Sequence, residues 1–322
     1  MMKRTLAAAL AAATLPTLGL VGAATAVADA GGRPATYQLT GDEGGSKFEG
    51  IGADQRRGVF YVSEVTGGEI HRGTATSTQT EEWLGAGADG RFTARGITTD
   101  ADGRVYIAGG PNGLDAANTR PDLWVYSASG ELLAALQVPN DDAFLNDVWI
   151  GPDGAASSTN SNDPQIFRVA IEAGAWSAEL WADATGTIER LPGFNLGGIV
   201  LLPDNSAFLV AQGTTGQLWR FDATNGSVSE VETGGADLTN ADGLVLQGTR
   251  LTVVRNFSRM VATLRLSADG SSAILISQEA TDPTRVLTTA KSLHGRILFV
   301  DSKFDEPVAA SPYEVVTDPF VS

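Results

Sequence analysis

A motif that recurs six times along the 322 residues constrains the fold of this chain more than any other feature. Each copy has an apolar stretch, a turn built from Asp, Asn, Gly or Pro, and a second apolar stretch, which is the pattern of a β-hairpin. Equivalent positions in successive copies lie 43 to 51 residues apart, a spacing typical of propeller blades or solenoid units. The copies are FEGIGADQRRGVFYVSEV, ARGITTDADGRVYIAGG, LNDVWIGPDGAASSTNS, LGGIVLLPDNSAFLVAQG, ADGLVLQGTRLTVVRNF and TRVLTTAKSLHGRILFVDS.

Further short apolar stretches follow each hairpin and complete a four-stranded unit. After the sixth hairpin only one more strand is evident, PYEVVTDPF, whereas Tyr37 to Thr40 near the N-terminus has the composition of an outer strand. If these two segments complete the sixth unit, both chain ends close a ring and no sheet edge is left open. We therefore predict an all-β fold, a six-bladed β-propeller of four-stranded blades, with two stacked β-sandwich domains as the alternative.

The N-terminus has the pattern of a secretory signal peptide over residues 1–30. Lys3 and Arg4 give it a basic start, an Ala/Leu stretch follows, and small residues at Ala28 and Ala30 form a cleavage site. A retained amphipathic anchor is the alternative, and Pro16 argues against it. We expect a secreted, extracellular protein whose residues 31–322 form a single propeller domain without membrane contact after cleavage.

Composition narrows the classes of partner. The formal net charge of −16 becomes −17 once the leader takes away Lys3, Arg4 and Asp29. A surface this acidic argues against nucleic acid and anionic membranes, which bind clusters of Lys and Arg. The chain has no cysteine, so packing or bound ions must hold it together outside the cell. We expect a monomer that binds a small-molecule substrate.

The repeat also predicts where functional side chains meet. In a propeller the innermost strand of each blade lines the central channel, and the strand starts converge at one mouth. The alignment places Glu49, Arg95, Asn146, Asn195 or Gly197, Asp242 and Arg285 at that mouth. Because side chains alternate along a strand, Asp147 is expected to point away from Asn146. Charged groups buried together in this way need partners or a ligand.

Three dipeptides at these positions carry a resemblance to a known family. Glu49-Gly50 in the first copy, Asn146-Asp147 in the third and Asp242-Gly243 in the fifth resemble the gluconolactonase and regucalcin-like (senescence marker protein) lactonase family. More distantly the chain resembles paraoxonases and strictosidine synthase-like proteins. The likeness covers the whole chain after the leader, and its short motifs are specific for the superfamily but weak for a substrate.

That resemblance implies a divalent cation in the channel, with Glu49, Asn146 and Asp242 matching the family's ligands. The ligand that the family takes from blade four is not matched, since Gly197 and Gly198 stand where Asn-Gly is expected, and Asn195 is the candidate to replace it. Carboxylate and amide oxygens suit calcium better than zinc. Asp242 is expected to act as the catalytic carboxylate, and Asn146, Arg95 and Arg285 are expected to bind substrate.

Two functions are consistent with this arrangement. The first is an exported, metal-dependent hydrolase of the lactonase or esterase type, acting on a small substrate, neutral or anionic. The second is a non-catalytic propeller that binds a small anion or a protein partner, with Glu49 and Asp242 paired to Arg95 and Arg285 in a structural network. The geometry of these four side chains distinguishes the two.

Overall fold

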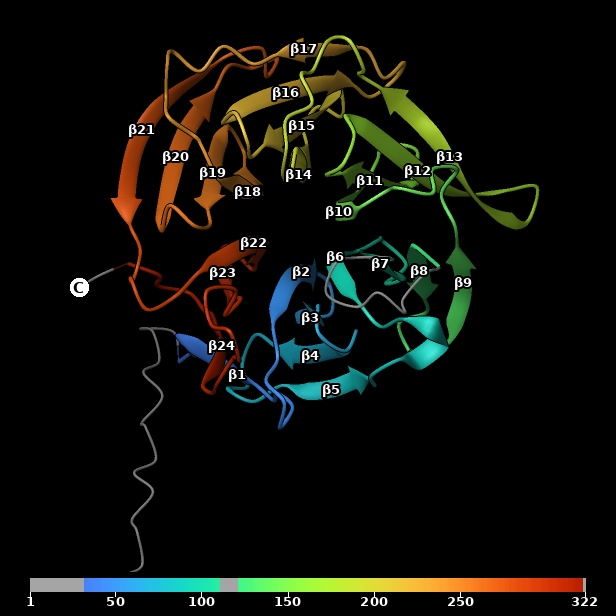
Figure 1. The fold of residues 1–322 in the computed structure, drawn as a ribbon, viewed down its shortest axis with the longest axis vertical. Coiled ribbons are helices and arrows are strands. Elements are labelled where there is room, and N and C mark those ends of the chain that lie inside the picture. Colours follow the sequence, from blue (N-terminus) through green and yellow to red (C-terminus); the bar gives the residue numbers. More distant parts are fainter. Residues whose placement is uncertain (1–31, 111–120, 321–322) are drawn as a thin grey trace, which may run out of the picture.

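Six antiparallel four-stranded sheets surround a common axis, as Figure 1 shows. The computed structural model describes residues 32–110 and 121–320, so the predicted leader at 1–30 lies outside the described residues. In blades one to three the strands are β2 (Phe48–Asp54), β3 (Val59–Glu64), β4 (Ile70–Thr74), β5 (Glu81–Leu84); β6 (Ala94–Thr99), β7 (Val105–Gly109), β8 (Leu123–Tyr126), β9 (Leu132–Leu136); β10 (Leu145–Ile150), β11 (Ala156–Asn160), β12 (Gln165–Glu172) and β13 (Ala175–Asp183).

Blades four and five follow in the same order from the axis outward, and blade six combines both ends of the described chain. Their strands are β14 (Leu196–Leu201), β15 (Ala207–Gln212), β16 (Gln217–Asp222), β17 (Val228–Glu230); β18 (Ala241–Gln247), β19 (Arg250–Arg255), β20 (Met260–Leu266), β21 (Ala273–Ala280); β22 (Leu287–Leu293), β23 (Arg296–Asp301), β24 (Tyr313–Val316) and β1 (Thr36–Leu39).

The predicted ring closure is confirmed. Strand β1 pairs antiparallel with β24, with Thr36 opposite Val316 and Leu39 opposite Tyr313. Blade one begins only a few residues later, so the segment between β1 and β2 joins blade six to blade one. The pairing covers the edge that β24 would otherwise expose.

Apolar side chains fill the spaces between neighbouring sheets. Between blades six and one, for example, Tyr37 and Phe60 pack edge to face with ring centres 4.9 Å apart, and Phe48 packs against Tyr313 at 5.5 Å. Such aromatic pairs add to the burial of apolar area that holds the blades together. No helix among the described residues is long and apolar enough to span a membrane.

Every innermost strand carries the same irregularity near its start. The register of the first pair of strands shifts after Phe48, Ala94, Leu145, Leu196, Ala241 and Leu287, which are equivalent positions in the six blades. A shift of this kind is a β-bulge, which adds a residue to one strand and turns two consecutive side chains toward one side. The bulge therefore decides which residues face the channel.

In blades one and five, glycine at the second bulge position follows from the distance between blades. A Cβ on Gly50 would lie 2.1 Å from the backbone oxygen of Arg95, and one on Gly243 would lie 2.4 Å from Cα of Thr289. The inner strand of the next blade occupies that space, so only glycine fits. The Glu-Gly and Asp-Gly dipeptides of the repeat thus have an architectural cause.

Candidate functional site

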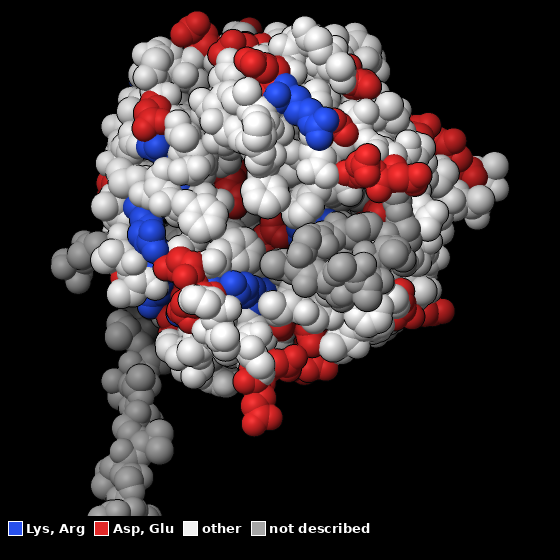
Figure 2. Space-filling model, viewed as in Figure 1, with Lys and Arg blue, Asp and Glu red and all other residues white. Residues whose placement is uncertain are grey.

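A cavity of about 680 Å³ opens at the mouth of the channel where the inner strands begin. Glu49, Arg95, Asn146, Gly197 and Asp242, from five successive blades, line its base. A second hollow of about 10 Å³ continues below it between the bulges and is large enough for one water or ion. Figure 2 shows acidic atoms inside the hollow at the centre of this face.

Three carboxylates surround the small hollow, which we call the floor of the cavity. They belong to Glu49, Asp147 and Asp242, and Asn146 and Thr289 complete the polar lining. Burial, and then the charges of Asp242 and Asp147, raise the pKa of Glu49 well above its usual range, although Arg95 acts in the opposite direction. Burial also raises the pKa of Asp242 to about 7. Carboxylates crowded in this way bind a proton or a cation.

Several oxygens at the floor are free to coordinate a cation. Asn146 donates through Nδ2 to Oγ of Ser161 at 3.0 Å, which leaves its Oδ1 without a hydrogen bond from the described residues. Asp242 accepts a hydrogen bond at Oδ2 from Asn256 Nδ2 at 2.8 Å, and its Oδ1 has no such donor in the described chain. Together with Glu49 these atoms form an oxygen-rich set of the kind that hard cations select.

Strand alternation predicts that Asp147 points away from Asn146, and this prediction is wrong. The side chain of Asp147 faces the channel beside Asn146. The bulge at this point turns both residues inward. Oδ2 of Asp147 accepts the backbone N–H of Ile199 in the next blade at 3.2 Å, and Oδ1 accepts the N–H of Val148 at 2.8 Å. Asp147 therefore joins two blades and adds a third negative charge to the floor.

Arg95 reaches the cavity as expected but pairs with backbone. Its guanidinium donates to the carbonyls of Leu145 and Gly109 and lies over the ring of Phe144, 3.8 Å from its centre. The remaining nitrogen, Nη1, is buried and has no hydrogen-bond partner among the described residues. Burial lowers the pKa of Arg95 to about 10, which leaves the group charged at neutral pH. Neither Glu49 nor Asp242 forms an ion pair with it or with any other described residue.

Arg285, which the alignment placed at the mouth, does not line the cavity or its floor. Its guanidinium forms ion pairs with Asp282 at 2.6 Å and Glu314 at 2.9 Å. The shared bulge shows that Thr288, three residues later, holds the position equivalent to Glu49 in blade six. The network of Glu49, Asp242, Arg95 and Arg285 that was considered as an alternative is therefore not formed.

Asn195 lines the large cavity, but neighbouring backbone groups already bind its side-chain amide. Its Nδ2 donates to the carbonyls of Ser161, Leu191 and Gly193, and its Oδ1 accepts the N–H of Leu191 at 2.9 Å. It does not reach the floor, so the structure gives no replacement for the blade-four ligand from this residue. Gly197 occupies the equivalent position without a side chain.

The walls of the large cavity are mostly apolar. Phe144, Phe194, Phe257 and Phe304 line it, and Phe194 and Phe257 are 61% and 51% exposed at its rim. Exposed aromatic side chains around a polar base are typical of pockets that hold the apolar part of a ligand. Sequence reasoning missed these residues because they lie outside the inner-strand positions that the repeat aligns. Neither histidine of the chain, His71 or His294, lines the cavity.

Comparisons with known proteins establish the fold and nothing narrower. No family model and no curated protein matches the chain. Similar structures include the major allergen Mala s 1 of Malassezia sympodialis, with 14% identity and a TM-score of 0.65 over 88% of this chain and 95% of that chain. A catalytically inactive virginiamycin B lyase from Staphylococcus aureus with quinupristin has 15% identity and a TM-score of 0.57 over 83% and 81%.

These proteins share the propeller fold. The hydrazine synthase of Kuenenia stuttgartiensis is similar as well, with 13% identity and a TM-score of 0.55 over 79% of this chain and 80% of that chain. The neighbours carry different activities on one architecture, so the fold alone does not assign a reaction. The six-bladed propeller expected from the repeat is thereby confirmed, whereas the narrower likeness to gluconolactonases stays a prediction.

Proposed function

We propose that the chain is a metal-dependent hydrolase of the lactonase or esterase type, with calcium held at the floor of the cavity. The observation that carries this proposal is the convergence of Glu49, Asp147 and Asp242 on one small hollow without an ion pair to any described residue. Asn146 adds a free amide oxygen there. Three buried carboxylates without a cation are unfavourable, so a divalent ion would relieve their repulsion.

Different residues of the cavity carry different steps of the proposed reaction. A cation held here would polarise the carbonyl of a bound ester or lactone. Asp242, with a free Oδ1 and a hydrogen bond from Asn256 that fixes its orientation, accepts a proton from the attacking water. Arg95 would offer Nη1 to a substrate oxygen, since Nε and Nη2 are held by backbone carbonyls. The phenylalanine walls exclude bulk water from this region.

The apolar walls also define the substrate. One guanidinium against three carboxylates gives little support for a strongly anionic ligand, and Arg285 does not contribute. Phe194 and Phe257 at the rim favour a substrate with an apolar body and a carbonyl at its inner end. The predicted leader would place this hydrolysis outside the cell.

Hydrolysis of a panel of lactones and aryl esters tests the proposal. With calcium present, kcat/KM is expected to rise with acyl length, and Glu49→Gln and Asp242→Asn are each expected to lower it about 100-fold or more. Phe257→Ala is expected to raise KM about five- to tenfold, because an aromatic contact worth about 1 kcal/mol is lost. Phe92→Ala is the control, since this residue is 46% exposed but does not line the cavity.

A non-catalytic binding protein is the competing function. In that case Arg95 Nη1 would hold an anionic group and the floor would stay free of metal. Binding of an aryl carboxylate without turnover of any ester, and without an effect of calcium, would overturn the hydrolase in favour of this alternative.

A further inference from the structure

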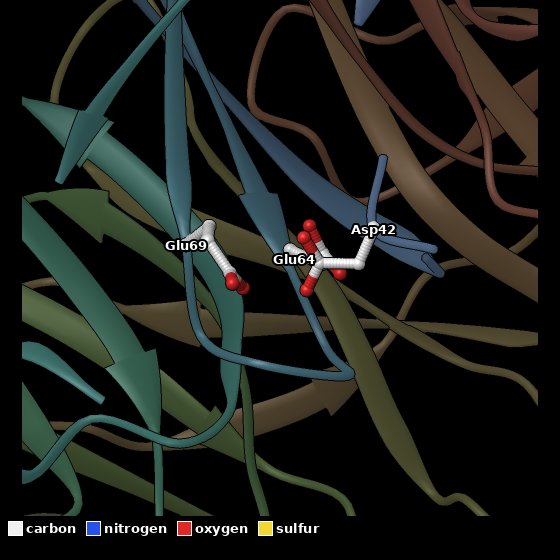
Figure 3. A group of neighbouring side chains, drawn as sticks. All are labelled: Asp42, Glu64 and Glu69. Atoms are coloured by element: carbon white, nitrogen blue, oxygen red, sulfur yellow. The ribbon is translucent and has the colours of Figure 1, made fainter. Parts of the chain in front are cut away.

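A second group of carboxylates lies in blade one, away from the floor of the channel. Asp42, Glu64 and Glu69 each offer an oxygen, and these three oxygens lie within 4.8 Å of one another (Figure 3). Glu64 ends β3, Glu69 directly precedes β4, and Asp42 belongs to the segment between β1 and β2. Three separate parts of the chain therefore bring negative charge to one point.

Burial makes this arrangement costly without a partner. Glu64 and Glu69 are almost inaccessible to solvent, Glu69 being only 4% exposed, whereas Asp42 is exposed. No Lys or Arg among residues 32–110 and 121–320 forms an ion pair with any of the three. The arginines of blade one are engaged elsewhere, for example Arg57 with Asp54 at 2.6 Å. Two buried carboxylates beside a third need a cation to offset their charge.

Unpartnered polar atoms point to the same place. Oε2 of Glu69 is buried and accepts no hydrogen bond from the described chain. Both ring nitrogens of His71, which is 2% exposed, are also without a hydrogen bond, and its Nε2 lies 3.5 Å from Oε2 of Glu64. Buried polar groups are nearly always satisfied, so several unsatisfied atoms around one point indicate a missing ligand.

We propose that Asp42, Glu64 and Glu69 bind a calcium ion that ties blade one to the segment joining it to blade six. Three carboxylates supply hard oxygen ligands, and the exposed side of Asp42 leaves room for the waters that complete six to eight ligands. The Nε2 of His71 lies 3.5 Å from Oε2 of Glu64, which places the imidazole beside this carboxylate, where it would orient Glu64 once the ion is bound. The ion would fasten the ring closure of a chain that has no cysteine.

Calorimetric titration of calcium into the chelator-treated full chain tests this site. This titration can be interpreted independently of the proposed hydrolase function, because Asp242→Asn removes only the proposed cation site in the channel. We expect calcium binding to persist in Asp242→Asn and to disappear when Glu69→Gln is added. Asp42→Asn in the same background is expected to weaken binding about tenfold or more, and Glu43→Gln, an exposed neighbouring acid, is expected to leave it unchanged.

Thermal unfolding gives a second readout of the same variants. Saturating calcium is expected to raise the unfolding midpoint of Asp242→Asn on the order of 5 °C, and to leave that of the doubly substituted protein unchanged. Asp42→Asn keeps the test decisive if Glu69→Gln does not fold, because Asp42 is exposed. Absence of calcium binding in Asp242→Asn, binding unaffected by Asp42→Asn and Glu69→Gln, or a preference for zinc over calcium would each overturn the proposal.

Discussion

The ammonium group of Lys291 in blade six lies 4.1 Å from the centre of the Trp149 ring in blade three, so side chains from opposite blades meet across the axis. Both residues come two positions after the floor residues Thr289 and Asp147 on their strands. They therefore close the channel below the floor and place a buried positive charge near Asp147. Burial lowers the pKa of Lys291, and Asp147 acts in the opposite direction.

Removing that charge should strengthen cation binding at the floor. Lys291→Met keeps the contact with Trp149, since a thioether also packs on an aromatic ring. We expect calcium affinity to rise a few-fold, on the order of 1 kcal/mol, because one repulsive charge is lost. Lys47→Met is the matched control, since Lys47 lies at the solvent-facing wall of the cavity, where salt and water screen its charge. Equal or weaker binding in Lys291→Met would contradict this reading.

The pH dependence of calcium binding follows from the floor carboxylates. Asp242 has a pKa of about 7 in the ion-free protein, and the pKa of Glu49 is raised as well. Protons therefore compete with the ion, and affinity should fall about tenfold for each pH unit below 7. Titrations between pH 5.5 and 8 check this, and an affinity that does not change across the range would show that these groups do not hold the ion.

The same shift has a consequence for stability without the ion. The folded pKa of Asp242 lies above the unfolded value of about 3.9. Its contribution to the free energy of unfolding is thus complete below pH 4 and is lost as pH rises through 7. In chelator, Asp242→Asn should unfold at a higher temperature than the unmodified chain at pH 8, with the difference shrinking toward pH 5. A constant difference would mean that Asp242 does not titrate in this range.

Blade four offers a way to add the ligand that the repeat lacks. A Cβ at Gly197 would lie 3.5 Å from Oδ1 of Asp242, which is ordinary contact, whereas one at Gly198 would lie 2.3 Å from the backbone oxygen of Asp242. Gly197→Asn is expected to tighten calcium binding about tenfold, because an amide oxygen joins the floor. Gly198→Asn is expected to destabilise the fold instead. Unchanged affinity in Gly197→Asn would place the ion elsewhere.

Asn195 should prove to be a structural residue. Asn195→Ala removes hydrogen bonds to three backbone groups of the loop before β14 and to the carbonyl of Ser161 in blade three, so we expect a loss of about 1 to 3 kcal/mol in the free energy of unfolding. Calcium affinity measured on the folded variant is expected to stay the same. A large loss of affinity with little loss of stability would restore Asn195 as a ligand.

The six-bladed architecture could be predicted from the sequence, because a hairpin recurs every 43 to 51 residues. The additional outer strand at Tyr37 to Thr40 predicts how the ring closes. The repeat could also place Glu49, Asn146 and Asp242 at one mouth. The sequence does not reveal which residues of blade six face the channel, because its bulge has Thr288 and Thr289 and no charged residue. Aligning blade six on Arg285 therefore sets its register three positions too early. Simple alternation likewise fails at the bulge that turns Asp147 inward.

Other features depend on contacts that no local pattern records. The amide of Asn195 is held by the loop at Leu191 and Gly193, and the choice between ligand and loop support depends on that backbone geometry. Asp42, Glu64 and Glu69 are spread over 28 residues without a ligand motif, and they meet only because ring closure brings the segment before β2 over the end of β3.

A crystal structure determined with calcium shows directly whether the ion binds at the floor of the cavity. We expect anomalous density in the small hollow, with oxygens of Glu49, Asn146 and Asp242 as ligands and Arg95 still bound to the carbonyls of Leu145 and Gly109. A hollow without the ion at saturating calcium, or Arg95 moved into an ion pair with Glu49 and Asp242, would contradict it.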